Sequence, residues 1–251
     1  HHGDFKACAD ALRSSGYGAD IGSSVVSVVK EGEPAKRFHM SDLGNAERLI
    51  AKYGQDIRYC SAWGKWLFWD GKRWLQDEHG GAKAYQMAHD VARSMLREAG
   101  DTEDADDRAA LAKWSLKCET KQRLEAIVFL AKTMPGIPVS SGQLDACSSI
   151  LNVGNGTFDL ESHSLRPHRR EDLLTRLVDI PYSEEADCQR WTSFLSRVLG
   201  DDETLMRYVW KAAGYSLTGR TDEQVFFFLH GAQGNNGKST FVETLLRILG
   251  D

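Results

Sequence analysis

Apolar side chains recur every three or four residues over several stretches of the chain, the spacing of one face of an α-helix. The predicted helices cover 41–53, 83–98, 104–132 and two segments between 185 and 219. Gly54 and Gly200 stand where helices can end, and Asp201 or Asp202 can cap the last helix of this series. Helices are therefore expected to be the main elements of the region 41–219.

Short strands with tight turns are predicted between these helices. Six aromatic residues fall within the sixteen positions from Tyr59 to Trp74, and the turn signals Gly64-Lys65 and Asp70-Gly71 divide them into two antiparallel hairpins. A further hairpin is predicted from Ile150–Val153 and Thr157–Leu160. The expected fold class is α+β, a mostly helical domain with small antiparallel hairpins.

The last thirty residues have the pattern of a strand, a glycine-rich loop and a helix. Gln224–Leu229 is apolar and uncharged, as is typical of a strand buried on both faces. The loop Gly231–Thr240 follows, and apolar residues from Phe241 to Leu249 then share a helical face. Small residues let backbone N–H groups close around phosphate oxygens, and the helix adds its positive end. This order predicts a site for ATP.

Two residues of this loop have specific expected roles. Lys238 is expected to reach the β and γ phosphates, and the Ser239 hydroxyl to hold Mg²⁺. In the usual pattern the first glycine stands five positions before the glycine-lysine pair, where this chain has Ala232, with Gly231 one position further back. The loop is either one residue longer than usual or has alanine in place of its first glycine. A glycine-rich turn with an incidental lysine is the alternative. The expected phosphate-binding residues are Gly231, Gly234, Asn235, Asn236, Gly237, Lys238, Ser239 and Thr240.

Composition is that of a globular protein, with 251 residues of which 41% are hydrophobic. The formal net charge of −5 gives no general attraction for nucleic acid, so DNA contact requires a local basic patch. Five scattered cysteines suggest neither a zinc site nor a disulfide framework. No apolar run approaches a membrane span, and we expect a cytosolic protein without membrane contact.

Two segments are candidates for single-stranded DNA binding. Trp66, with Lys72 and Arg73, can form a platform on which bases stack; the favoured alternative is a small sheet that buries its tryptophans. Arg169 and Arg170 belong to the densest basic cluster, which can contact a DNA backbone; the favoured alternative is a solvated loop.

An acidic run at 101–107 can be interpreted in two ways. Its carboxylates could bind metal ions, as in a polymerase site. They precede the predicted helix 104–132, however, and acids are favourable at a helix N-terminus. The second interpretation is preferred, because metal-binding carboxylates of that kind normally stand on hydrophobic strands.

Several stretches resemble the phage and plasmid primase family, whose poxvirus relative is a primase-helicase with a superfamily 3 helicase at its C-terminal end. The loop ending in Asn236-Gly237-Lys238-Ser239-Thr240 has the form that this helicase class uses. The other resembling stretches are Asp42–Glu47, Ala62–Trp74, Leu151-Asn152, Asn155-Gly156, Asp159-Leu160, Leu165–His168 and Gly214–Gly219.

The resemblance implies a tail or linker at 1–40, a collar-type domain at 41–219, and the start of an α/β ATPase at 220–251. The ATPase would assemble into a ring, commonly a hexamer, and act on single-stranded DNA or a replication fork in a bacterial host's cytoplasm. We expect a fragment shortened just after the loop, with the catalytic residues beyond Asp251. The alternative function is a non-enzymatic module for assembly and single-stranded DNA binding.

Overall fold

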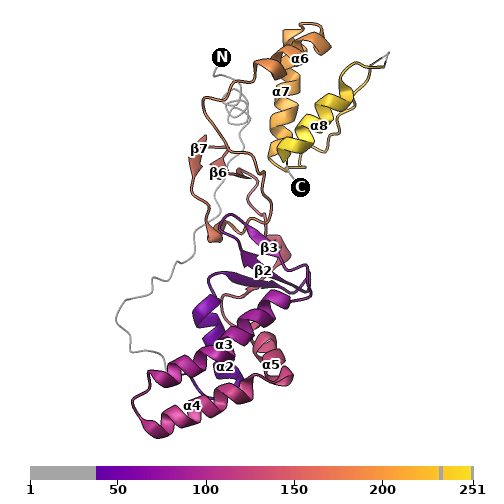
Figure 1. Ribbon diagram of the computed structural model, residues 1–251. Coiled ribbons are helices and arrows are strands. Elements are labelled where there is room, and N and C mark those ends of the chain that lie inside the picture. The colour runs from indigo at the N-terminus through magenta and orange to yellow at the C-terminus, as the bar shows by residue number, and fades with distance from the viewer. Residues whose placement is uncertain (1–37, 232–233, 250–251) are drawn as a thin grey trace. The chain divides into compact units, whose positions relative to one another are not determined.

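A computed structural model describes residues 38–231 and 234–249 of the chain. Their contacts define two compact units. We call residues 38–70 and 74–144 the helical unit, and residues 71–73 and 145–249 the C-terminal unit. About half of the described residues are helical and the strands form small sheets, which confirms the predicted α+β class (Figure 1). The predicted boundary at residue 220 stays a prediction, and most of the segment 1–40 lies outside the described residues.

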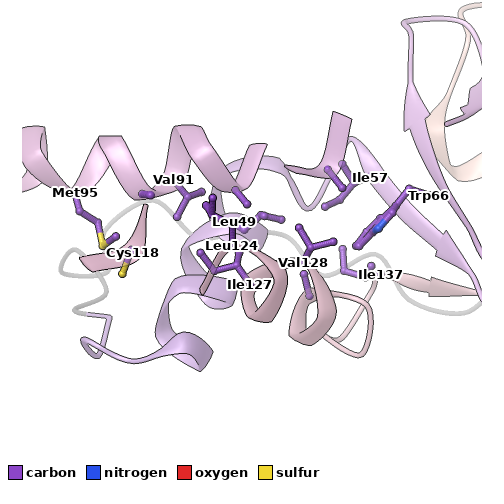
Figure 2. Packing of buried hydrophobic residues seen from close by; sticks show 14 of the residues in the cluster. Leu49, Ile57, Trp66, Val91, Met95, Cys118, Leu124, Ile127, Val128 and Ile137 are labelled. Atoms are coloured by element: carbon purple, nitrogen blue, oxygen red, sulfur yellow. The ribbon is translucent and has the colours of Figure 1, made fainter. Parts of the chain in front are cut away.

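Four α-helices of the helical unit pack in pairs. Helix α3 lies against α4, and α2 lies against both α5 and α3 (Figure 1). Figure 2 shows Leu49, Leu124 and Ile127 gathered between the helices, and all three are buried. Burying such side chains is the main favourable term in folding. The helices are α2 (Asp42–Tyr53), α3 (Ala82–Gly100), α4 (Ala105–Cys118) and α5 (Lys121–Ala131).

The prediction of one helix over 104–132 is wrong, because the chain breaks between α4 and α5. Thr120 is extended, with φ −75° and ψ 147°. Leu111 and Cys118 of α4 are buried where α4 packs on α3, whereas α5 packs mainly on α2. A single straight helix could not present its apolar residues to both partners. The acidic run stands at the N-terminus of α4, as the preferred interpretation expected. The Asp104 carboxylate accepts hydrogen bonds from the backbone N–H groups of Asp106 and Asp107.

The stretch Asp42–Glu47, which contributes to the family resemblance, has a structural role in the described chain. Asn45 is fully buried on α2; its amide donates to the Cys118 thiol at 3.1 Å and accepts from Trp114 Nε1 at 3.2 Å. Burial raises the pKa of the Cys118 thiol. Because a buried amide needs these partners, Asn45 fixes α2 against α4.

Helix α2 is also joined to α3 through a polar cluster on the surface. The Asp90 carboxylate of α3 accepts hydrogen bonds from the Lys52 ammonium and the Tyr53 hydroxyl. The hydrogen bond from Lys52 is the main reason that the pKa of Asp90 is lowered, and the same bond raises the pKa of Lys52. These contacts lie at the edge of the core and orient the two helices without adding a catalytic constellation.

The two aromatic hairpins are confirmed. Strand β2 pairs antiparallel with both β1 and β3, with Gly64 and Gly71 at positive φ in the turns. Among the described residues the strand order of this sheet is β3-β2-β1-β4, and β4 pairs parallel to β1. Trp66 and Trp74 are buried, as the core interpretation expects. The strands are β1 (Ile57–Cys60), β2 (Lys65–Trp69), β3 (Trp74–Gln76) and β4 (Pro138–Val139), and the short 3₁₀ helix η1 (Ser141–Gln143) follows.

The C-terminal unit begins with a three-stranded antiparallel sheet. The predicted hairpin is confirmed as β5 (Ile150–Val153) and β6 (Gly156–Asp159). A third strand, β7 (Ser164–Arg166), pairs with β6 and was not predicted. With only three residues, β7 is too short to show a clear alternation of apolar and polar side chains, and basic residues follow it. The 3₁₀ helix η2 (Arg170–Asp172) comes next.

Two helices then follow as predicted, α6 (Gln189–Leu199) and α7 (Glu203–Leu217). Gly200 ends α6 in the left-handed region at φ 68°, and the Asp202 carboxylate caps α7 by accepting from the N–H groups of Thr204 and Leu205.

The prediction of a buried strand over Gln224–Leu229 is wrong for the described chain. The segment forms no strand, and the side chains of Phe226 and Phe228 are 85% and 79% exposed. A strand buried on both faces needs neighbouring strands at its edges, and none within residues 38–231 and 234–249 pairs with this one. Helix α8 (Lys238–Leu249) follows the loop as predicted. No helix in the described part of the chain is long and apolar enough to cross a membrane.

Candidate nucleotide-binding loop and basic surface

The loop leads directly into a helix. Helix α8 begins at Lys238, three residues earlier than predicted, and the Phe241 N–H donates to the Gly237 carbonyl at 2.9 Å. Gly237 has φ 82°, a conformation that side chains other than glycine rarely adopt. Ser239 and Thr240 are exposed in the first turn of α8. The N–H groups of this turn have no partners within the helix and can donate to an anion.

The two ends of the loop come together. Lys238 Nζ donates to Asn236 Oδ1 at 2.6 Å, and Gly231 lies beside both side chains. A Cβ atom on Gly231 would collide with the Asn236 amide and stand 3.3 Å from Lys238 Nζ. The missing side chain at Gly231 therefore leaves room for the Asn236 amide, whose oxygen accepts from the Lys238 head group. This close approach favours the interpretation in which Gly231 is the first glycine of a loop one residue longer than usual.

The middle of the loop is open. A Cβ atom on Gly234 would meet no atom within 4 Å, so close packing does not require glycine there. Asn235 adopts a positive φ of 59°, which asparagine tolerates better than most residues. Ala232 and Gln233 lie outside the described residues. The assignment of Gly234 and Asn235 to phosphate binding thus stays a prediction.

An exposed ion pair precedes the predicted strand. The Arg220 guanidinium donates to both carboxylate oxygens of Asp222, and this hydrogen bonding lowers the pKa of the Asp222 carboxyl. Both residues belong to the turn that follows α7. The pair holds that turn and points to no further catalytic group.

Trp66 is buried, as the favoured interpretation expected, and the candidate role in stacking on bases is wrong. Its side chain is only 4% exposed, and its ring lies 5.2 Å from the Tyr59 ring in the core. Strand β2 lies between β1 and β3, so its central side chains pack on the helices that cover the sheet. A base has no access to this indole.

The structure does bring the other DNA candidates together, through a residue that sequence reasoning did not single out as functional. The Asn152 side-chain amide donates to the Lys72 carbonyl at 3.1 Å and to the Arg176 carbonyl at 2.8 Å. Its Oδ1 atom lies 2.8 Å from His168 Nδ1. The turn with Lys72 and Arg73 is thereby fixed beside the basic cluster that holds Arg169. The motif Leu151-Asn152 offered the only sequence signal for this role.

Charges in this basic surface are partly neutralised. Arg166 forms two hydrogen bonds with Asp172, at 2.7 and 2.8 Å, and the carboxylate raises the pKa of the guanidinium. Lys72 Nζ lies 3.8 Å from Asp179 Oδ1. Arg169 is exposed, whereas Arg170 is half-buried in η2. Arg169 is therefore the best placed of the predicted residues to contact a phosphate.

Comparison with known proteins places the chain in a family. A family model described as D5 N terminal like matches residues 46–200, which is more than half of the chain. The chain belongs to the D5 N-terminal-like family. The matched region runs from α2 to the end of α6, and the loop at residues 231–240 lies beyond it.

Two curated viral proteins resemble parts of this D5 N-terminal-like chain. A protein of Acanthamoeba polyphaga mimivirus, named "putative helicase", is 29% identical over 112 residues, which are 43% of the chain and 12% of the viral protein. A protein of Invertebrate iridescent virus 6 with the same kind of name is 23% identical over 128 residues, which are 49% of the chain and 13% of that protein. The aligned region thus spans about an eighth of each viral protein's length.

Proposed function

We propose that this chain contains the N-terminal domain and the phosphate-binding loop of an ATP-dependent replicative DNA helicase of the primase-helicase type. One observation carries the proposal: a D5 N-terminal-like region is followed by a glycine loop whose two ends meet around Lys238. The helicase names of the two viral relatives support it. The finer proposal is an α/β ATPase domain that begins near residue 220 and works in a ring, commonly a hexamer, on single-stranded DNA.

Four of the described residues would take part in binding ATP with Mg²⁺. Lys238 Nζ would exchange its hydrogen bond to Asn236 for phosphate oxygens, and its charge would offset theirs. Ser239 would ligate the metal through its exposed hydroxyl. Gly231 and Gly237 let the loop backbone pack against Asn236 and helix α6, where any larger residue would collide. ATP supplies the phosphoanhydride bond whose hydrolysis drives movement.

Unwinding of a forked DNA duplex by the intact protein tests this function. With ATP and Mg²⁺ we expect strand separation that stops when a non-hydrolysable ATP analogue replaces ATP. A blunt duplex of the same sequence is the control substrate. It should not be unwound, since a helicase that loads on single strands requires the fork. Strand separation of equal extent with the analogue would contradict the proposal.

A second candidate function is a non-enzymatic module for assembly and single-stranded DNA binding. The convergence of the Lys72 turn with Arg169 through Asn152 favours it. We expect Arg169→Ala to weaken binding of oligonucleotides of any sequence, and to lower the salt slope of log K by about 1, because one phosphate contact is lost.

Fluorescence anisotropy at several salt concentrations measures this slope. Arg207→Ala is the matched control, because Arg207 is an exposed arginine on α7, outside the basic cluster at residues 165–170. Equal salt slopes for Arg169→Ala and the unaltered protein would remove Arg169 from the interface.

A further inference from the structure

We propose that helix α6 supports the nucleotide loop and that Trp191 is the positioning residue that couples nucleotide binding to the D5 N-terminal-like domain. The inference rests on the proposed function, because it assumes that the loop binds ATP. It adds that the family domain and the nucleotide site are mechanically joined through α6, the last helix of the matched region.

The closest approach between loop and helix is at Gly237. A Cβ atom there would lie 2.9 Å from both Phe194 Cζ and Val198 Cγ1 of α6, a distance that real Cβ contacts essentially never show. Gly237 therefore meets two requirements, a positive φ and direct contact of backbone with α6. Because Lys238 follows immediately, the face of α6 determines where the phosphate-binding lysine begins its helix.

A second contact holds the first turn of α8. The rings of Trp191 on α6 and Phe241 on α8 are stacked, with centroids 5.8 Å apart and planes 14° apart. Trp191 also stacks on Phe194, with centroids 5.3 Å apart. Phe194 is the same residue that lies against Gly237, so the two contacts are continuous. Phe241 lies three residues after Lys238, one helical turn away. The stack and the glycine contact thus fix α8 on both sides of the lysine.

Helix α6 is itself well anchored. Leu195 is 1% exposed, α6 packs on α7, and the Ser196 hydroxyl is hydrogen-bonded to the Asp201 carboxylate where the two helices meet. A rigid support is what a positioning role needs, since small displacements of a binding group weaken its contacts. When ATP draws Lys238 toward its phosphates, the strain passes through Gly237 and Phe241 to α6. Trp191, half-buried at this junction, is placed to report the change.

Titration of the intact protein with ATP and Mg²⁺, followed by tryptophan emission and by calorimetry, tests the inference. We expect Trp191→Leu to weaken ATP binding about two- to tenfold, the range of aromatic pair contributions. Trp191→Phe keeps an aromatic stack and should bind ATP within about twofold of the unaltered protein, but it should lose the emission change. Trp63→Phe, an exposed tryptophan of the helical unit, is the matched control and should retain both signals.

The outcomes separate this inference from the function on which it rests. If Lys238→Ala loses ATP binding while Trp191→Leu binds as the unaltered protein does, the inference fails and the proposed function stands. If Lys238→Ala still binds ATP normally, both fail. Should Trp191→Leu not fold, Trp191→Phe decides alone: an emission change that persists without Trp191 overturns the coupling.

Discussion

Replacing Lys238 with alanine is expected to lower the ATPase rate of the intact protein by at least about 100-fold, the typical cost of one lost charge-stabilising donor in a catalytic site. Lys238 Nζ stands at the point where Gly231, Asn236 and the start of α8 meet. The absence of a side chain at Gly231 lets the Asn236 amide lie beside Lys238, and alanine at 238 would remove the cation that the proposed phosphate requires. Release of inorganic phosphate at saturating ATP is the measurement.

Lys211→Ala is the matched control for this substitution. Lys211 is an exposed lysine on α7 in the same unit, so its loss changes the net charge equally without touching the loop. Its ATPase rate should stay within about twofold of the unaltered protein, as surface substitutions rarely matter. An ATPase rate for Lys238→Ala that equals the control's would show that the loop is an incidental glycine-rich turn.

Replacing Ile127 with alanine is expected to destabilise the helical unit by about 2–5 kcal/mol, because the change leaves a cavity in a close-packed core. Ile127 is fully buried on α5, and Figure 2 shows it beside Leu124 and Leu49. Hydrogen exchange of the α2 and α5 amides, followed by mass spectrometry, measures the effect inside the intact protein. Faster exchange should appear in both helices, since α2 and α5 pack on each other.

Phe129 gives the control within the same helix. It lies two residues after Ile127 and is 67% exposed, so Phe129→Ala removes a larger side chain without opening the core. We expect little change in the α2 amides for this variant. Equal acceleration of exchange by the two substitutions would mean that the core of the helical unit does not lie between α2 and α5.

Local signals were enough to predict most of the secondary structure. The stop at Gly200 and the cap at Asp202, one of the two predicted candidates, depend on neighbouring residues only, and the structure confirms both. The break between α4 and α5 depends instead on which partner each helix packs against. That choice is tertiary, and the residues around Thr120 carry no glycine or proline to mark it.

The strand predicted at 224–229 does not form, and a local pattern cannot show whether partner strands are present. Its apolar composition predicts burial on both faces, yet the partners that would bury it are not among the described residues. Apolar composition thus indicates that a segment tends to be buried, but neighbouring strands determine whether it forms a strand.

The order of loop and helix in the sequence predicted the local structure around Lys238, whereas residue type misplaced Trp66. Gly237 and Lys238 stand at a turn and a helix start, as a phosphate loop requires. Trp66 was a candidate because tryptophan can stack on bases, but its place on a central strand buries it. Asn152 was overlooked as a link between the basic segments, because its three partners are far apart in the sequence.

The family resemblance and the family match agree on the N-terminal region. The residues that carried the resemblance include Asn45 and Asn152, which the structure uses to join elements of the fold. Such residues identify a fold and bring no chemistry of their own. The proposed function therefore depends on the loop at residues 231–240, which lies beyond the matched region.

Calorimetric titration of the intact protein with ATP and Mg²⁺ is the most direct measurement of the central claim. We expect saturable binding at one site per chain, competition by ADP, and loss of the binding heat in Lys238→Ala. Absence of binding up to millimolar ATP, in protein whose α2 and α5 amides are protected from exchange, would contradict the assignment of residues 231–240 as a nucleotide site.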